Sequence, residues 1–347
     1  MNYIGSKYSI LDYIDETIED FVKPQDKNIT LCDIFSGTGT VGKYFKKKGY
    51  NIIANDIQYY SYVTTKHLLE NNDELKFEKL RAENIEPFID LNDLNGVEGF
   101  IYKNYSIAGT KGSLHERQYF SDENAAKIDA IRQKIEEWNN AGKLTEGEYF
   151  FLIASLVESA DKVANTASVY EAFLKHLKKS AEKPLVLKPI ELVIVPETKE
   201  YKVYNEDGNE LIKNIRGDIL YMDPPYNTRK YDTNYHILET IALYDNPEIK
   251  GKTGVRTETT KKSKFCQKKE ATAVFEDIIK NANFKYILLS YNDEGIIAVE
   301  DIKRIMSKYG RYKCYGKKHK RFKADNKRDY IKDFTIEYIH CLEKKDI

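Results

Sequence analysis

The tetrapeptide Asp223-Pro224-Pro225-Tyr226 constrains the fold of this chain more than any other segment. It follows a short apolar run, residues 219–222, which predicts a buried strand. Two consecutive prolines have no backbone N–H to donate to a strand ladder, so the chain must leave the sheet at a rigid corner. A carboxylate before this corner, carbonyls within it and an aromatic ring after it can hold an amino group on a planar base. The tetrapeptide therefore predicts a site that modifies an amino group of a nucleobase.

The N-terminal part of the sequence predicts a βαβ unit with a glycine-rich turn. Apolar runs at 28–35 and 50–54 predict strands, and residues 41–48 have helical spacing. The turn Ser36-Gly37-Thr38-Gly39-Thr40 joins the first strand to the helix, where glycines and free helical N–H groups allow a ligand to approach the backbone. Asp33 and Asp56 follow the strands. The first acid suits an amino-bearing cation better than a pyrophosphate, and the second is typical of a ribose contact.

The rest of the chain predicts an α/β domain interrupted by helices. A helix is expected at 9–21, and residues 60–188 have a largely helical pattern, with amphipathic stretches at 122–139 and 146–163. Strand signals return at 192–195, 201–204, 218–222, 286–291 and 334–342. Helices are expected at 235–245, 271–281 and 298–308. This order indicates one sheet domain with a helical insertion of about 130 residues.

Composition favours a globular protein in a reducing cytoplasm. Of 347 residues, 41% are hydrophobic and 32% are charged, and no apolar run is long enough to predict a membrane span. The first residues lack the apolar core of a signal peptide. The four cysteines form no CxxC pair, so we expect buried thiols and no metal site.

The formal net charge is zero, but basic residues are unevenly placed. Between Lys303 and Arg328 there are twelve Lys or Arg residues and one acid, Asp325. Neutralising phosphates requires local patches rather than a global charge. The stretch fits a nucleic-acid contact, and it fits a solvated lysine-rich surface equally well.

Together, Asp33-Ile34-Phe35-Ser36-Gly37-Thr38-Gly39 and Tyr221-Met222-Asp223-Pro224-Pro225-Tyr226 resemble the motifs of the amino-directed DNA methyltransferases. The Asp form of the tetrapeptide is similar to the adenine-N6 enzymes, and the motif order is similar to their alpha, Dam-like group. Tyr3-Ile4-Gly5-Ser6-Lys7 resembles that group's leading motif. The resemblance covers residues 1–60 and about 200–295. It implies an α/β fold, a Rossmann-like S-adenosylmethionine-dependent methyltransferase sheet with a large, mainly helical insertion.

The resemblance implies S-adenosylmethionine as the cofactor. Asp33 and the glycine backbone would hold its methionine part, and Asp56 its ribose. Asp207 is placed to contact its adenine, although an Asp-Gly turn explains this residue equally well. The expected cofactor contacts are Tyr3, Lys7, Asp33, Phe35, Ser36, Gly37, Thr38, Gly39, Asp56, Ile57, Asp207 and Asp223.

The expected catalytic residues are Asp223, Pro224, Pro225 and Tyr226. The target adenine must leave the duplex and would stack on Tyr226. The Asp223 carboxylate and the Pro224 carbonyl would accept the two N6 hydrogens and direct the nitrogen lone pair at the methyl group. This chemistry requires neither a metal nor a covalent enzyme intermediate.

The resemblance also assigns domains and partners. Residues 1–60 and 190–347 are expected to form the catalytic domain, and residues 61–189 the insertion that recognises double-stranded DNA. We expect a role in a restriction–modification system with a cognate restriction endonuclease, and no membrane or metal partner. The candidate DNA contacts are Lys103, Arg117, Asn227, Arg229, Lys230 and Tyr231.

Other functions fit parts of the sequence. Methylation of adenine N6 in RNA or of cytosine N4 in DNA is compatible with the tetrapeptide, although serine is commoner at its first position in the cytosine enzymes. A nucleotide-dependent oxidoreductase shares the opening βαβ unit but leaves Asp33 and the tetrapeptide without a role. A catalytically silent DNA-binding protein would not need the complete set of acids.

Overall fold

The computed structural model describes residues 7–24, 28–196, 199–226, 231–257, 263–320 and 334–345. These residues form two compact units. Residues 66–194 and 232–257 make up the first, which we call the helical unit, and the other described residues make up the sheet unit. Residues 232–257 were expected in the catalytic domain by sequence, yet they pack with the insertion.

The sheet unit contains seven strands and the helices between them. The strands are β1 (Thr30–Asp33), β2 (Asn51–Asn55), β3 (Tyr201–Tyr204), β4 (Arg216–Met222), β7 (Asn283–Asn292), β8 (Gly310–Lys320) and β9 (Phe334–Lys344). The helices are η1 (Lys7–Ile10), α1 (Leu11–Phe21), α2 (Thr40–Lys47), α10 (Gly208–Leu211), η2 (Lys264–Cys266), α13 (Ala271–Asn281) and α14 (Val299–Tyr309). Helix α3 (Tyr59–Glu70) begins in this unit and ends in the other.

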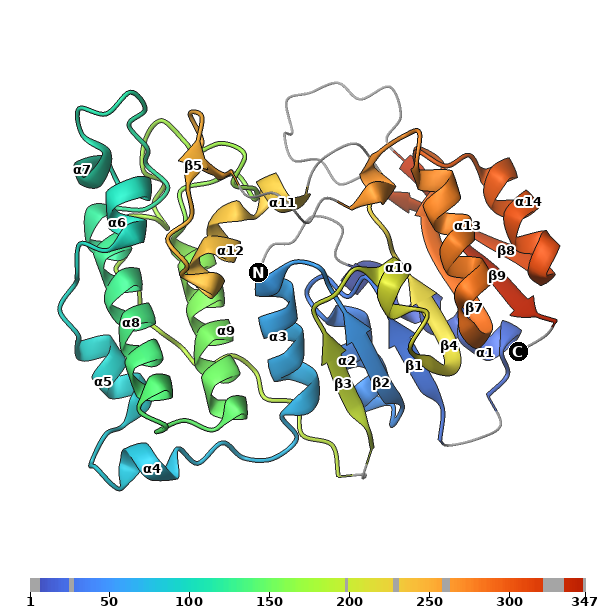
Figure 1. Ribbon diagram of the computed structural model, residues 1–347, viewed down its shortest axis with the longest axis horizontal. Helices are drawn as coiled ribbons and strands as arrows, with labels where there is room; N and C mark the ends of the chain where they lie inside the picture. Colours follow the sequence, from blue (N-terminus) through green and yellow to red (C-terminus); the bar gives the residue numbers. More distant parts are fainter. Residues whose placement is uncertain are drawn as a thin grey trace. The chain divides into compact units, whose positions relative to one another are not determined.

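The sheet has the strand order β3-β2-β1-β4-β7-β9-β8 (Figure 1). Its first five strands are parallel, and β9 runs antiparallel to both β7 and β8. The chain moves outward from β1 to one side through β2 and β3, and then returns to its other side as β4. Ligands bind at the carboxyl ends of the strands at such a reversal of strand order. The confirmed α/β fold therefore directs attention to the ends of β1 and β4.

The two faces of the sheet are covered by different helices. Alternate residues of β1, β4 and β7, such as Cys32, Leu220 and Leu289, join a buried cluster with apolar residues of α13 and α14. Helix α2 packs against β1 and β2, and α1 against β9. Because side chains alternate across a strand, Asp33 and Tyr221, which are paired in register, share the face opposite this cluster.

The helical unit is built around two long helices, α8 (Asp122–Asn140) and α9 (Glu146–Val163), which pack together. Each begins at a side-chain cap: Ser121 accepts from the Asn124 N–H, and Thr145 forms a capping box with Glu148. The shorter helices are α4 (Glu78–Arg81), α5 (Pro87–Asp93), α6 (Phe100–Tyr105), α7 (Ile107–Thr110), α11 (Tyr231–Asn234) and α12 (His236–Leu243). A two-stranded hairpin, β5 (Ile249–Lys250) with β6 (Val255–Arg256), follows α12.

Most of the predicted elements are present, and the differences lie in strands; the β5–β6 hairpin, for example, was not predicted. Residues 192–195 form no strand; they have apolar character but no partner strand, since β2 pairs with β3 instead. The lysine-rich stretch contains an unpredicted strand, β8, which pairs with β9 along its whole length. None of the described helices is long and apolar enough to span a membrane.

Candidate active site

The end of β1 and the end of β4 bring two acids to the same edge of the sheet. Asp33 is the last residue of β1, and Asp223 directly follows β4, its neighbour. The chain leaves the sheet at Asp223, as the prolines predict, and the Tyr226 carbonyl then accepts a hydrogen bond of 2.9 Å from the Ile296 N–H. The corner is therefore fixed to the segment that follows β7.

Asp33 is a buried acid with an unsatisfied oxygen. Its side chain is inaccessible to solvent, and Oδ1 has no hydrogen-bond partner among the described residues. Burial raises the pKa of Asp33 well above its usual range, and the charges of Asp223 and Asp56 raise it further, whereas backbone N–H groups of Gly42 and Phe35 lower it. A buried polar atom without a partner is costly and calls for a ligand. An amino group or a cation is the partner that this oxygen lacks.

The glycine-rich turn is organised by Asp56. Gly37 and Gly39 adopt left-handed backbone angles, with φ of 51° and 71°. The Gly37 N–H donates to Asp56 Oδ2 at 2.8 Å, and Asp56 Oδ1 accepts from the Gln58 N–H at 2.8 Å. The Gly39 N–H donates to the Ser36 carbonyl at 2.8 Å. These two glycine amides are thus engaged inside the turn, and Asp56 holds the turn through both of its oxygens.

The other predicted cofactor contacts in this region lie on or beside the turn. Phe35 is half-buried and meets Phe265 edge-to-face, with ring centroids 5.3 Å apart. Ser36 is buried and Thr38 is hydrogen bonded through its hydroxyl to Thr40 at 2.8 Å. Ile57, just after Asp56, is half-buried. All these residues are placed by β1, β2 and the loops at their carboxyl ends.

Lys7 joins the site from η1 and lies between two carboxylates. Its Nζ is 3.1 Å from Asp223 Oδ1 and 3.9 Å from Glu337 Oε2, on β9. Burial opposes the lysine charge, but the two carboxylates prevail and raise the pKa of Lys7 above its usual range. Burial, with a smaller contribution from Glu337, raises the pKa of Asp223 to about 6 against the opposing effect of Lys7. Although Asp223 Oδ1 and Lys7 are close enough for an ion pair, this oxygen lacks an aligned hydrogen bond.

Glu337 is a charged residue of the site that the sequence patterns did not single out. It pairs in register with Asn292, the last residue of β7, and its Oε2 has no hydrogen-bond partner among the described residues. An acid in the strand run 334–342, flanked by Ile336 and Tyr338, was the available signal. Its partner Lys7 is at the other end of the chain, so only the fold reveals the pair.

Tyr226 places a half-buried aromatic ring at the same corner. Its ring meets Tyr291 edge-to-face, with centroids 6.2 Å apart, and Lys7 Nζ lies 5.8 Å from its centroid. Pro224 is buried and Pro225 half-buried. Asp223 and Tyr226 thus both lie near Lys7, and their contacts with a base stay predictions.

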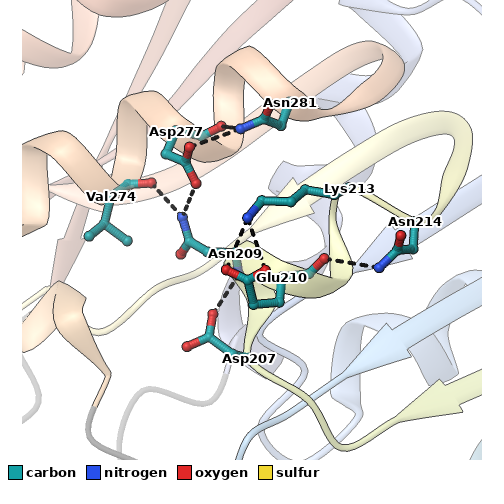
Figure 2. Close-up of polar contacts among 8 residues, drawn as sticks. All are labelled: Asp207, Asn209, Glu210, Lys213, Asn214, Val274, Asp277 and Asn281. Carbon is teal, nitrogen blue, oxygen red and sulfur yellow. Dashed lines mark hydrogen bonds and ion pairs between the residues drawn. The ribbon is translucent and has the colours of Figure 1, made fainter.

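Asp207 lies near the carboxyl end of β3 but serves as a helix cap. Figure 2 shows its carboxylate accepting from Asn209, whose N–H is 2.8 Å from Asp207 Oδ1, at the start of α10. The Asn209 side chain also donates to the Val274 carbonyl and to Asp277 Oδ2 on α13 (Figure 2). The carboxylate of Asp207 is exposed, so its contact with a cofactor adenine stays a prediction.

The candidate DNA contacts are separated by the structure. Lys103 is exposed on α6, whereas Arg117 is buried and donates to backbone carbonyls of Asn104, Gly251 and Lys252. Tyr231 begins α11. Tyr3, Asn227, Arg229 and Lys230 lie outside the described residues. Within the described part of the chain, no group of three or more His, Cys, Asp or Glu residues could hold a metal ion.

Comparison with known proteins points in the same direction as this geometry. Residues 3–305 match the family model described as D12 class N6 adenine-specific DNA methyltransferase. Type II methyltransferase M.NlaIII of Neisseria lactamica is 47% identical over 346 residues, which cover 99% of each chain. Type II methyltransferase M.FokI of Planomicrobium okeanokoites is 41% identical over 99% of this chain but 53% of its own length. Type II methyltransferase M.CviAII of Paramecium bursaria Chlorella virus 1 is 36% identical over 93% of each chain.

Proposed function

Because this chain belongs to the D12 class family of N6 adenine-specific DNA methyltransferases, we propose that it transfers a methyl group from S-adenosylmethionine to adenine N6 at a specific site in duplex DNA. The observation that carries the proposal is the pair of acids at the reversal of strand order, of which Asp33 is buried and Asp223 is partly buried. Asp33 offers an unpartnered oxygen to a cofactor, and Asp223 stands with Tyr226 at the next strand end. The relatives are named type II methyltransferases, which supports a role for this chain in a restriction–modification system. The proposal includes a cognate endonuclease as partner.

The residues at the end of β1 fit S-adenosylmethionine. Its α-amino group matches the unpartnered Oδ1 of Asp33, and Asp56, at the carboxyl end of β2, is in the position typical of a ribose contact. Asp33, Asp56 and the side chains of the intervening turn would hold it. When bound, the cofactor supplies a methyl group made electrophilic by its sulfonium.

The tetrapeptide prepares the target nitrogen. An adenine can present N6 at this corner only after leaving the base stack, and Tyr226 supplies a ring on which it can lie. The Asp223 carboxylate and the Pro224 carbonyl accept the two N6 hydrogens, which directs the lone pair away from them. Asp223 acts here as a carboxylate, and Lys7, 3.1 Å away, favours that charged form. Alignment of the groups then contributes much of the rate.

A direct assay tests the activity and the role of Asp223. Wild-type protein is incubated with radiolabelled S-adenosylmethionine and with duplex DNA, single-stranded DNA or RNA, and the products are analysed as nucleosides. We expect N6-methyladenine in duplex DNA. Asp223→Ala should lower turnover by at least about 100-fold, because a contact to the reacting group is lost, while S-adenosylmethionine binding largely survives.

An exposed acid serves as the matched control. Asp301→Ala, on α14, removes a carboxylate that pairs with Arg304 and should leave turnover unchanged. Label in cytosine, or in RNA only, would contradict the proposed substrate. Full turnover by Asp223→Ala would overturn the proposed role of the tetrapeptide.

A further inference from the structure

Each carbonyl of the β5–β6 hairpin loop lies within hydrogen-bond distance of one buried side chain. The loop comprises residues 251–254 and is closed by a hydrogen bond of 3.2 Å from the Gly254 N–H to the Gly251 carbonyl. Arg117 donates to the Gly251 and Lys252 carbonyls at 2.9 and 3.1 Å. Tyr105 Oη donates to the Gly254 carbonyl at 2.8 Å.

His236 completes this set. Its Nε2 lies 3.1 Å from the Thr253 carbonyl, and its Nδ1 lies 2.8 Å from the Thr233 carbonyl. The ring is inaccessible to solvent. Burial lowers the pKa of His236 to about 4, so its neutral ring has one N–H and donates to one of these two carbonyls.

The stem of the hairpin is fixed as well. Arg256 makes two hydrogen bonds to the Asp245 carboxylate, at 2.8 and 2.5 Å. A hairpin of two strands is at best marginally stable in water, and these strands have two residues each. Buried side chains from α6, α12 and the segment before α8 supply the stability that the strands lack.

The outward side of the loop carries donors and positive charge. Among the described residues, the N–H groups of Lys252 and Thr253 find no hydrogen-bond acceptor. The side chains of Lys250 and Lys252 are exposed. One acid is close in sequence, Glu248, whose side chain accepts a weak bond of 3.4 Å from the Thr257 hydroxyl. Arg117 and Tyr105 donate to the Gly251, Lys252 and Gly254 carbonyls. The loop therefore offers backbone N–H donors and two lysines, which is the chemistry that binds an anion.

We propose that the loop 251–254 binds a backbone phosphate of the DNA substrate through the amides of Lys252 and Thr253 and the side chains of Lys250 and Lys252. The inference rests on the proposed function, which makes DNA the anion. A phosphate contact positions a protein on the duplex without reading its sequence. Arg117 then acts on DNA indirectly, as a positioning residue that fixes the loop. The hairpin lies after the tetrapeptide in sequence, outside the expected recognition region 61–189.

The salt dependence of DNA binding tests the proposal. Dissociation constants of wild type and of Lys250→Ala/Lys252→Ala are measured for a duplex of random sequence between 50 and 200 mM salt. Each phosphate contact contributes about 0.9 to the slope of log K against log salt, so the variant, which weakens one such contact, should lose up to about 0.9 from this slope. The KM for DNA should rise several-fold. The loss of affinity should be equal for a duplex of random sequence and for a duplex that contains the target site of methylation.

A matched pair of lysines provides the control. Lys76 and Lys79 are exposed at the start of α4, which Figure 1 shows at the other end of the helical unit from β5. Lys76→Ala/Lys79→Ala should retain the wild-type slope. An unchanged slope in the loop variant would overturn the proposal, and a loss confined to the methylated sequence would indicate a base contact instead. Failure of the proposed function can be distinguished from failure of the loop proposal, because wild-type protein would then methylate no duplex DNA.

Discussion

At the scale of single residues, the site depends on how three acids are partnered. Asp56 has both oxygens hydrogen bonded to backbone N–H groups, and Asp223 lies against Lys7. Asp33 is fully buried with an unpartnered oxygen. Asp56 therefore organises a loop, Asp223 contacts a lysine, and Asp33 has an oxygen that a ligand can contact. The groups that lie beside each acid at the strand ends determine these roles.

The first prediction concerns Asp33. Asp33→Asn should weaken S-adenosylmethionine binding by about 10- to 100-fold, because a charge-assisted hydrogen bond contributes about 1.5–3 kcal/mol. The fold should be as stable or more stable at pH 7, since burial raises the pKa of Asp33 and the amide avoids burying a charge. Calorimetric titration and thermal melting measure both effects. Asp218→Asn, an exposed acid on β4, should bind like wild type; equal affinity of the Asp33 variant would exclude the cofactor contact.

The second prediction concerns Glu337. Glu337 raises the pKa of Asp223, which is about 6, and shares Lys7 with it. In Glu337→Gln, Lys7 is left to Asp223 alone, so the pKa of Asp223 falls. The carboxylate is then retained to lower pH, and the acid limb of the kcat/KM profile should move to lower pH.

The profile also separates this role from simple packing. Lys7, Glu337, Asp33 and Tyr226 are the charged or titratable groups around Asp223 that the geometry identifies. Glu343→Gln removes another carboxylate of β9, which pairs with Arg311, and should leave the acid limb in place. A Glu337→Gln profile that only drops in height, without moving, would count against the electrostatic role.

At the scale of elements, sequence periodicity predicted the helices whose packing depends on their own apolar face. The helices near 122–139, 146–163, 271–281 and 298–308 were found because each has an apolar face of its own. Strand β8 was missed since its lysines face solvent and its pairing with β9 defines it. Glu337 and the β5–β6 hairpin were missed for the same reason. Their partners, Lys7 for one and Arg117 for the other, are distant in sequence.

The third prediction concerns the hairpin and its anchor. Arg117→Ala removes the donor of the Lys252 carbonyl and the side-chain donor of the Gly251 carbonyl, which keeps only the Gly254 N–H. We expect faster amide exchange in residues 249–256 and a loss of about 2–3 kcal/mol in the free energy of unfolding, since Arg117 is a buried charged donor.

Exchange mass spectrometry and denaturant titration give the two quantities. Arg81→Ala removes an exposed ion pair with Glu86 and should cost at most about 1 kcal/mol. If the hairpin exchanged at the wild-type rate in Arg117→Ala, the anchoring role would be wrong.

At the scale of the whole molecule, the 55 basic and 55 acidic residues cancel. No net field then favours DNA, and attraction depends on where charges are placed. The basic strand β8 illustrates the point: Arg311 pairs with Glu343 and Lys313 with Asp20. By contrast, the lysines of the β5–β6 loop have no acid partner among the described residues. The fold therefore pairs some basic residues of β8 with acids, whereas Lys250 and Lys252 can contact DNA.

Stability also depends on buried groups whose pKa values differ between the folded and unfolded chain. His340, on β9, is inaccessible to solvent; its Nδ1 lies 2.8 Å from Tyr312 Oη, and its Nε2 has no partner among the described residues. Burial lowers the pKa of His340 to about 4. An unfolded histidine titrates near 6.5. The neutral ring therefore stabilises the fold above about pH 6.5, and that contribution is lost as the pH falls towards 4.

The fourth prediction is a difference in this pH dependence. Between pH 6.5 and 4, one such histidine can account for up to about 3 kcal/mol, at 1.36 kcal/mol for each pKa unit. Buried Asp33 and Asp223 act with the opposite sign, because their pKa values are raised and acid relieves their burial. The free energy of unfolding is therefore compared between wild type and His340→Phe at each pH by denaturant titration. We expect His340→Phe to have a lower free energy of unfolding than wild type at pH 7, because Tyr312 loses its acceptor. This difference should shrink as the pH approaches 4. Parallel curves for the two proteins would show that His340 does not titrate on folding.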